Sequence, residues 1–304
     1  MIYDMIVVGA GPAGLTAAIY ARRANKSVLI LEKAAFGGQM TFSPKIENYP
    51  GFASLSGSEL ADKMVEQVLN RGTDVEIETV TGIELDGNVK KVHTEDGNCY
   101  EGYSVIIAAG AKHRRLGLPN EERFVGEGIS FCAVCDGAFY DNKTIALIGG
   151  GNSALQEALL LSEGCKKVTI VQNLDFLTGE AALQELLKQR GNVEIILGTV
   201  VEEILDTPDF SGIKIKKVAT GEITELLADG MFVAIGLEPE NEPFANLVDL
   251  NDYGYVDAEE NCLTKTPGIF VAGDCRKKGI RQVTTATADG ATAAIAACRY
   301  LDSL

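Results

Sequence analysis

The feature that most constrains the fold of this chain is a glycine-rich turn that joins an apolar run to a helical stretch near the start of the sequence. Met5 to Val8 is followed by Gly9-Ala10-Gly11-Pro12-Ala13-Gly14, by a helical stretch from Leu15 to Ala24, and by Ser27 to Glu32. This order predicts a strand, a helix and a second strand. The three glycines suit a tight turn, the close approach of a pyrophosphate, and the packing of helix on strand. We therefore predict a dinucleotide-binding unit in which Glu32 accepts a ribose hydroxyl.

A second unit of the same kind begins more than a hundred residues later. Its first strand is predicted at Thr144 to Ile148, its turn at Gly149 to Ala154, its helix at Leu155 to Ser162 and its second strand at Lys167 to Val171. Two such units at this separation imply two nucleotide-type domains.

A third signal belongs with the first unit. An apolar strand from Thr266 ends in Gly273-Asp274, and a helix of small residues follows from Ala286 to Ala297. We expect this strand end to place Asp274 against a ribityl or ribose hydroxyl, with the helix N-terminus facing phosphate. The predicted fold is therefore α/β, with two Rossmann-like dinucleotide-binding domains, the second inserted into the first.

The predicted domains are residues 1–115 for the first part of the outer domain, 116–240 for the inserted domain, and 241–304 for the second part of the outer domain. We expect the chain to cross between them near Ala109 to Ala111 and near Gly236 to Pro239, and these crossings would serve as hinges.

The inserted domain carries two cysteines, Cys132 and Cys135, with Asp136 directly behind them. Cysteines at this spacing form an easily reduced disulfide, and the lower-pKa thiol supplies a thiolate that attacks other disulfides. Asp136 is the natural proton donor. The alternatives are half of a zinc site or a buried structural pair. Zinc would need a second pair of Cys or His ligands at comparable spacing, and the other five cysteines are scattered singly.

Composition excludes several classes of protein. The chain has 304 residues, a formal net charge of −16 and 46% hydrophobic residues, which is typical of a globular protein with two domains. The negative charge argues against nucleic acid or an anionic membrane as partner. The start of the chain lacks a signal-peptide pattern, and no apolar run is long enough to span a bilayer. Seven cysteines at mostly irregular spacing do not suggest a secreted disulfide framework, so we expect a cytoplasmic protein.

Taken together, these motifs resemble the low-molecular-weight thioredoxin reductases, and the resemblance runs along almost the whole chain. It also includes Gly37-Gly38-Gln39-Met40, Ile46 to Gly51, and Arg281-Gln282-Val283 after Gly273-Asp274. The resemblance implies FAD as cofactor, a homodimer, and a dithiol in the inserted domain. The catalytic residues would be Cys132, Cys135 and Asp136, with no metal. The cofactor-binding residues would be Gly9, Gly11, Pro12, Ala13, Gly14, Glu32, Lys33, Gly38, Gln39, Asn48, Ala109, Gly110, Gly273, Asp274, Arg281, Gln282 and Val283.

The expected chemistry follows from this resemblance. Reduced flavin passes two electrons to the disulfide, Asp136 protonates a leaving thiolate, and the dithiol then reduces thioredoxin through a mixed disulfide. Cys135 would face the flavin and Cys132 would attack thioredoxin. Because one dithiol serves both a buried flavin and a protein substrate, the two domains are expected to rotate relative to each other.

One segment departs from the family pattern. Relatives that use NADPH carry His-Arg-Arg-x-x-x-Arg after the second strand of the inserted domain, where this chain has Gln172 to Thr178 without a single basic residue. Each lost charge-assisted hydrogen bond to the 2′-phosphate costs about 1.5–3 kcal/mol, so NADPH binding is doubtful. NADH would require an acid at the strand end, and the first acid is Asp175.

The chain is in this respect similar to flavin thioredoxin reductases of anaerobic bacteria that take electrons from reduced ferredoxin. Basic clusters at Lys112 to Arg115 and at Arg276 to Lys278 would steer an acidic ferredoxin towards the flavin, unless they are ordinary solvated charges. Three alternatives stay open: a reductase with an atypical NADPH or NADH site, a reductase of another protein disulfide, and a non-catalytic flavoprotein that senses redox state or binds metal.

Overall fold

The computed structural model describes residues 1–43, 45–206 and 208–304, and the chain folds into two compact units. Unit 1 comprises Met1–Lys112 and Glu238–Leu304, and unit 2 comprises His113–Leu237. The two crossing segments are strands β7 (Ala111–His113) and β16 (Leu237–Pro239), which pair with each other. The units therefore divide inside a strand pair, slightly before the predicted boundaries at 115 and 240.

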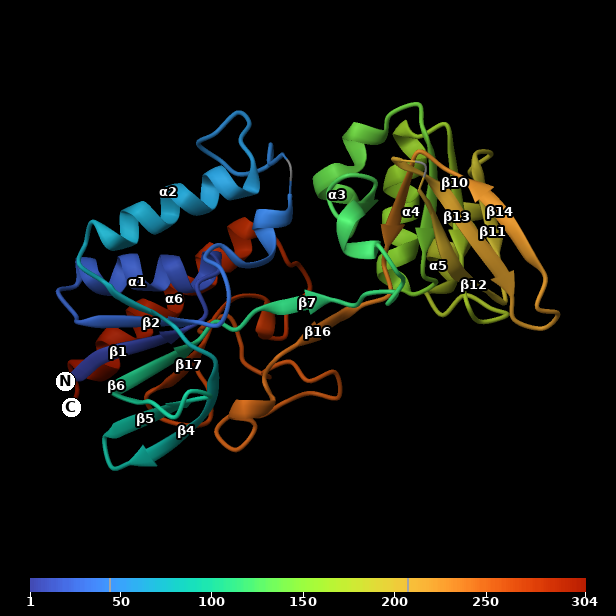
Figure 1. Cartoon of the computed structure of the whole chain (residues 1–304). Coiled ribbons are helices and arrows are strands. Elements are labelled where there is room, and N and C mark those ends of the chain that lie inside the picture. Colours follow the sequence, from blue (N-terminus) through green and yellow to red (C-terminus); the bar gives the residue numbers. More distant parts are fainter. Residues whose placement is uncertain (44, 207) are drawn as a thin grey trace. The chain divides into compact units, whose positions relative to one another are not determined.

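Unit 1 is built on a parallel sheet with an antiparallel extension (Figure 1). The strand order is β3-β2-β1-β6-β5-β4, and β17 also pairs with β6. The strands β1, β2, β3, β6 and β17 run parallel, whereas β4 and β5 form a hairpin whose second strand pairs antiparallel with β6. Their bounds are β1 (Ile2–Val8), β2 (Val28–Glu32), β3 (Asp74–Ile77), β4 (Val80–Asp86), β5 (Val89–Thr94), β6 (Cys99–Ile107) and β17 (Ile269–Val271).

Helices α1 (Pro12–Arg23) and α6 (Val283–Leu301) pack along each other on one face of this sheet, and α2 (Gly57–Leu69) lies beside α1 (Figure 1). Helix α1 begins at Pro12 rather than at the predicted Leu15. Proline suits the first helical position, because its missing amide hydrogen would have had no partner there. Helix α6 likewise begins at Val283 rather than at Ala286.

Unit 2 has a second parallel sheet, in the order β11-β10-β9-β15-β8, with α3, α4 and α5 beside it (Figure 1). Strands β9 and β10 have the bounds that the sequence predicts. A separate antiparallel sheet contains β12, β13 and β14. The bounds are β8 (Ile129–Ser130), α3 (Ala133–Asp136), β9 (Thr144–Ile148), α4 (Asn152–Gly164), β10 (Lys167–Val171), α5 (Ala181–Lys188), β11 (Val193–Ile196), β12 (Thr199–Asp206), β13 (Phe210–Lys217), β14 (Ile223–Leu227) and β15 (Gly230–Val233).

Short 3-10 helices complete both units. They are η1 (Gly38–Phe42), η2 (Glu121–Phe124), η3 (Gly137–Tyr140), η4 (Glu242–Phe244) and η5 (Gly273–Cys275). Within the described ranges, no helix combines the length and the apolar character that crossing a membrane requires.

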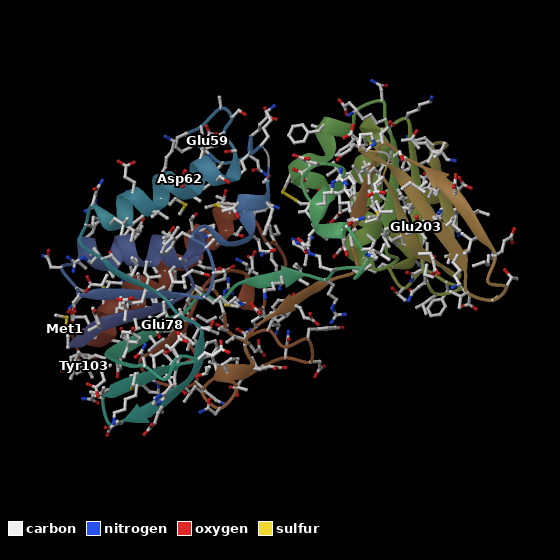
Figure 2. All side chains as sticks on the ribbon, viewed as in Figure 1. Met1, Glu59, Asp62, Glu78, Tyr103 and Glu203 are labelled. Atoms are coloured by element: carbon white, nitrogen blue, oxygen red, sulfur yellow. A yellow bond between two sulfur atoms is a disulfide. The ribbon has the colours of Figure 1, made fainter. Side chains whose placement is uncertain are left out.

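Each unit has hydrophobic cores of its own. In unit 1, one core lies between the sheet and α1 and α6, and a second lies on the other face of the sheet. In unit 2, one core lies under α4, and another lies between the parallel sheet and the three-stranded sheet. The acidic excess of the chain lies outside these cores. Examples are Glu59 and Asp62 on α2 and Glu203 on β12, whose side chains extend into solvent (Figure 2).

Candidate active site

Cys132 and Cys135 form a disulfide at the start of α3, with 5.3 Å between their Cα atoms. Cys132 is the N-cap residue of this helix, and its Sγ accepts a hydrogen bond from the backbone amide of Cys135 at 3.2 Å. Both cysteines are partly exposed, and Val134 between them is 62% exposed. A nucleophilic sulfur at this position is stabilised by amide hydrogens and is accessible to solvent.

Asp136 follows the disulfide at the end of α3. Its Oδ2 accepts a hydrogen bond from the Ser130 hydroxyl at 2.6 Å, and the Oγ of Ser130 accepts one from the Cys132 amide at 3.2 Å. The Oδ1 of Asp136 is buried and has no hydrogen-bond partner among the described residues. Burial raises the pKa of Asp136 above its usual value, and the hydrogen bond from Ser130 opposes this shift. This carboxyl therefore holds a proton more firmly than a solvated aspartate.

Ser130 was not predicted as a site residue. It lies at the end of the short strand β8 and connects the dithiol backbone to the acid. A serine two residues before a cysteine is too common in sequences to indicate this connection.

Phe131, which precedes the disulfide, contacts His113, the last residue of β7, and Arg115, two residues further along the chain. The His113 ring lies 5.0 Å from the Phe131 ring between centroids, and the Arg115 guanidinium lies 4.3 Å from the Phe131 centroid. Burial, together with the nearby charge of Arg115, lowers the pKa of His113 to about 4, so His113 is neutral at pH 7.

A second acid lies close to α3. Glu157 is on α4, and its carboxyl accepts a hydrogen bond from the Ala133 amide. Burial raises the pKa of Glu157 to about 7, which the Ala133 hydrogen bond partly opposes. The sequence did not mark this residue, because a glutamate on a helix usually faces solvent.

The first glycine-rich turn lies in unit 1, between β1 and α1. Gly9 has a φ of +106°, and a Cβ on Gly14 would lie 1.9 Å from the Gly9 carbonyl oxygen, so both positions require glycine. A Cβ on Gly11, by contrast, would meet no atom of the chain within 4 Å. Open space at the N-terminus of a long helix fits the pyrophosphate of a dinucleotide such as FAD.

Glu32, at the end of β2, holds this turn in place through hydrogen bonds to its carboxylate. Its Oε2 accepts a hydrogen bond from the Ala10 amide at 2.6 Å, and its Oε1 accepts one from the Ala34 amide at 3.0 Å. Each carboxylate oxygen can accept a further hydrogen bond, so the predicted ribose contact is compatible with this bracing. The neighbouring Lys33 forms an ion pair with Glu240.

Two of the other predicted cofactor residues of unit 1, Gly38 and Gly273, lie against the same turn. A Cβ on Gly38 would lie 3.3 Å from the Gly11 Cα, and one on Gly273 would lie 2.8 Å from the Ala13 Cβ. Asn48 donates a hydrogen bond to the Gln282 side chain at 3.2 Å. Gln39 lies in η1, Val283 begins α6, and Ala109 and Gly110 follow β6.

Asp274 and Arg281 lie at the end of β17 and before α6. The Oδ1 of Asp274 is buried without a hydrogen bond among the described residues, although the Lys278 ammonium lies 3.2 Å from it. The Arg281 guanidinium lies 4.1 Å from the Tyr255 ring centroid. An acceptor oxygen that is buried and accepts no hydrogen bond from the described residues fits the hydroxyl of a bound ligand such as FAD. The structure thus brings the predicted residues together, while their contacts with a cofactor stay a prediction.

The two basic clusters do not form free positive patches, which corrects the expectation from the sequence. Arg276 and Lys278 are largely buried, and both form ion pairs with Asp289 beneath them. Lys277 pairs with Asp257. In the other cluster Lys112 pairs with Glu240 and Arg115 pairs with Glu122, while His113 is neutral. The partner carboxylates come from other segments of the fold, so the folded chain neutralises charge that looks concentrated in the primary structure.

The second glycine-rich turn, in unit 2, is covered by the chain itself. The Gly150 carbonyl accepts hydrogen bonds from the Thr178 and Gly179 amides, each at 2.9 Å, and from the Thr178 hydroxyl at 3.2 Å. A Cβ on Gly150 would lie 2.5 Å from the Gln172 side chain. The Asn152 side chain exchanges two hydrogen bonds with Glu180, at 2.7 and 2.9 Å. The segment 172–180 thus binds the Gly150 carbonyl and the Asn152 side chain beside the start of α4.

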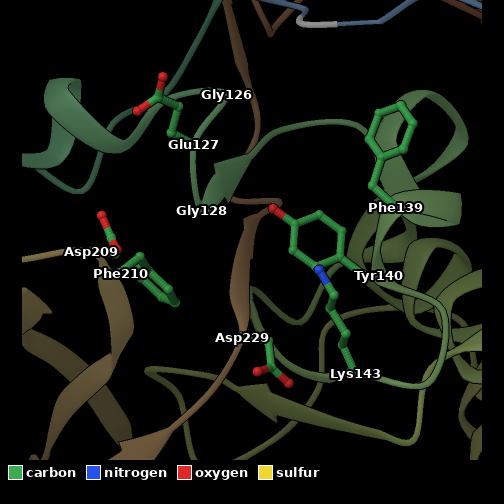
Figure 3. Close-up of a pocket in the computed structure, with 9 residues that line it drawn as sticks. All are labelled: Gly126, Glu127, Gly128, Phe139, Tyr140, Lys143, Asp209, Phe210 and Asp229. Atoms are coloured by element: carbon green, nitrogen blue, oxygen red, sulfur yellow. The ribbon is translucent and has the colours of Figure 1, made fainter.

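A cleft of about 260 Å³ lies elsewhere in unit 2 (Figure 3). Tyr140 and Phe210 lie on opposite sides of it, and Lys143 and Asp229 line it as well. Asp229 is engaged by the Thr144 amide at 2.7 Å, and the Lys143 ammonium lies 5.4 Å from the Tyr140 ring centroid. None of the predicted site residues lines this cleft. No group of three or more His, Cys, Asp or Glu side chains in the described part of the chain could hold a metal ion.

Comparison with known proteins gives a consistent result along the whole chain. Residues 3–290 match the family described as pyridine nucleotide-disulphide oxidoreductase. The thioredoxin reductase of Bacillus subtilis is 41% identical over 304 residues, which cover 100% of this chain and 96% of that protein. A protein of Clostridium pasteurianum, described as a 34.2 kDa protein in a rubredoxin operon, is 42% identical over 299 residues, or 98% of this chain and 97% of that one.

A solved structure agrees with these relatives. The crystal structure of thioredoxin reductase from Streptococcus pyogenes superposes with a TM-score of 0.94 at 42% identity, and the match covers 100% of this chain and 99% of that chain. The α/β fold with two Rossmann-like units, the second inserted into the first, is confirmed.

Proposed function

Because the chain belongs to the low-molecular-weight thioredoxin reductases, within the pyridine nucleotide-disulphide oxidoreductase family, we propose that it reduces thioredoxin through Cys132 and Cys135. In this proposal the electrons come from reduced ferredoxin. FAD, bound at the first glycine-rich turn, would supply the conversion of single electrons into a two-electron reduction of the disulfide. The other steps are assigned to side chains of this chain.

Cys132 is proposed as the sulfur that attacks thioredoxin, and Cys135 as the one nearer the flavin. The Cys135 amide, which donates to the Cys132 Sγ, stabilises negative charge on that sulfur. Asp136 holds a proton at neutral pH more readily than a solvated acid does and delivers it to a leaving thiolate. Ser130 fixes the acid through Oδ2 and leaves the buried Oδ1 free of other partners among the described residues.

The proposal of ferredoxin rests on one observation, the charge of segment 172–180, which lies against the turn at Gly150. A pyridine nucleotide would bind at the start of such a helix, with its phosphates close to this segment. The covering segment 172–180 contains Asp175 and Glu180 and no basic residue. A 2′-phosphate would therefore meet negative charge where its binding requires positive charge.

The name of one relative also supports a protein as the electron donor. The protein of Clostridium pasteurianum is named for a rubredoxin operon, and rubredoxin is an electron carrier rather than a nucleotide. The ion-paired basic clusters, by contrast, no longer support steering of an acidic partner, because Arg276, Lys278 and Lys112 face carboxylates of the same chain.

The alternative donor is NADPH or NADH at an atypical site. It is favoured by the retained backbone of the second turn, where Gly149 still has a φ of +134° and a Cβ there would lie 2.4 Å from the Ala234 carbonyl oxygen. This geometry preserves the architecture of a nucleotide site even though segment 172–180 covers it. Reduction of a protein disulfide other than that of thioredoxin is a further alternative, since the dithiol itself does not specify its partner.

An anaerobic titration of the flavin separates the donors. Reduced ferredoxin is expected to bleach the flavin and to support thioredoxin reduction, whereas stoichiometric NADPH and NADH should leave the flavin oxidised. Rapid bleaching by stoichiometric NADPH would contradict the ferredoxin proposal. A Cys132→Ser variant, in which the flavin is still reduced but thioredoxin is not, controls for electrons that bypass the dithiol. The homodimer and the cytoplasmic location stay predictions.

A further inference from the structure

Glu157 is a buried acid beside the dithiol that the proposed chemistry does not use. It lies on α4, which packs against α3, and it accepts a hydrogen bond from the amide of Ala133, the first residue of α3. Its Oε2 is buried and has no hydrogen-bond partner within the described ranges. A buried carboxyl oxygen without a partner is costly, so its presence next to a redox site calls for a reason.

The carboxyl and the redox sulfur depend on the same turn of backbone. Ala133 donates to Glu157, and Cys135 donates to the Cys132 Sγ, both from the first turn of α3. When the disulfide opens, a thiolate at Cys132 adds negative charge beside this turn. A carboxylate at Glu157 disfavours that charge, whereas a neutral carboxyl does not.

We propose that Glu157 is a positioning residue that takes up a proton when the Cys132–Cys135 disulfide is reduced, so that the new thiolate does not face a second negative charge. The inference rests on the proposed redox role of the dithiol and goes beyond it. It assigns the disulfide a proton partner in addition to Asp136, on a different helix.

The step balances with a dithiol as reductant. The Cys132–Cys135 bond breaks and receives two electrons, one sulfur takes a proton and becomes a thiol, and the other stays a thiolate. The Glu157 carboxylate takes a second proton. A dithiol such as dithiothreitol releases two electrons and two protons when it forms its own disulfide, so no other reactant is needed.

The surroundings of Glu157 make this coupling feasible near neutral pH. Burial raises the pKa of Glu157 to about 7, and the Ala133 hydrogen bond opposes this shift. Strand β9, one of the elements that pack against α4, carries no charged residue. The other elements that pack against α4 also carry titratable or charged side chains, but none of these contributes to the raised pKa of Glu157. They are Asp136 on α3, Tyr140 on η3, Glu185 and Lys188 on α5, and Lys167 on β10.

The test is the pH dependence of Cys132 alkylation by iodoacetamide in the dithiothreitol-reduced holoprotein, followed by mass spectrometry. We expect two steps in the wild-type profile, one of them near the pKa of Glu157. In Glu157→Gln the profile should have one step, and the apparent pKa of the thiol should fall by about 0.5–1.5 units. Glu157→Asp, which keeps an acid, should retain two steps.

Glu163→Gln is the matched control, because Glu163 lies on the same helix, is exposed and pairs with Arg190. Its profile should match the wild type. A single-step wild-type profile, or a Glu157→Gln profile that superposes on a two-step wild-type one, would overturn the inference. These measurements use dithiothreitol as reductant and need neither thioredoxin nor ferredoxin nor a pyridine nucleotide. Their result can therefore be interpreted even if the proposed function is wrong.

Discussion

At the scale of single residues, the site is organised around a conflict between burial and charge. Asp136 lies next to a disulfide in a position that penalises its ionised form, and among the described residues the Ser130 hydroxyl is what compensates. An acid held this way is costly for the fold but useful for chemistry, because the proton is available where a thiolate leaves. Stability and turnover therefore make opposite demands on this position.

The variant Asp136→Asn tests this conflict. Turnover with thioredoxin should fall by about 10²–10⁴-fold, the usual contribution of a general acid. The folded-state pKa of Asp136 lies above its ordinary value of 3.8, so the wild-type free energy of unfolding should fall as pH rises from that value through the raised pKa. Asparagine does not titrate, and the variant should gain stability relative to wild type across that window.

Denaturant unfolding at a series of pH values measures the second effect. Asp96→Asn, which changes an exposed acid in the hairpin turn of unit 1, is the control and should track the wild type. If the stability difference between Asp136→Asn and wild type did not depend on pH, Asp136 would not carry the raised pKa on which its catalytic role depends.

At the scale of elements, glycines on the helices of unit 1 fall into two classes. Gly290 on α6 is a packing glycine, since a Cβ there would lie 2.1 Å from the Ala13 carbonyl oxygen of α1. Gly11, the N-cap of α1, borders open space. The first kind holds two helices together, whereas the second leaves room for a ligand.

Alanine substitutions should therefore separate folding from cofactor binding. Gly290→Ala should destabilise the protein by at least about 1–3 kcal/mol, because overpacking against backbone outweighs the ~1 kcal/mol that alanine gains within a helix. Gly11→Ala should unfold at the wild-type temperature as apoprotein but bind FAD more weakly, since its methyl group enters the space predicted for the pyrophosphate. Thermal unfolding of the apoprotein and quenching of FAD fluorescence measure the two effects. If Gly11→Ala bound FAD with wild-type affinity, the pyrophosphate of FAD would not bind at this turn.

The same elements show what the sequence reveals and what it does not. Local patterns predict β9 and β10 correctly, because short apolar runs and glycine-rich turns are local signals. The basic run at Arg276 is misjudged as exposed, since its partner Asp289 comes from α6 and is visible only after packing. Glu157 and Ser130 are missed for the same reason, because their importance lies in contacts with α3 that no spacing encodes.

At the scale of the whole molecule, the chain is one domain interrupted by another, and this is visible in the cores. Each of the four hydrophobic clusters contains residues from one unit only. The chain leaves unit 1 at β7 and returns at β16, and these strands pair. The insertion therefore joins unit 1 at two neighbouring points, which allows an independent fold on each side of them.

Excision of unit 2 follows as a test of this architecture. A chain in which a short glycine linker joins Lys112 to Glu238 should fold, because the cores around α1, α6 and β6 remain complete. It should bind FAD, since the residues around Gly11 and Asp274 lie in unit 1, and it should lack all thioredoxin reduction, since Cys132 and Cys135 are removed. Circular dichroism, FAD fluorescence and a thioredoxin assay measure these outcomes. If the shortened chain lacked fixed tertiary structure and did not bind FAD, unit 1 would depend on unit 2 for folding. The separate hydrophobic cores would then not be sufficient for independent folding.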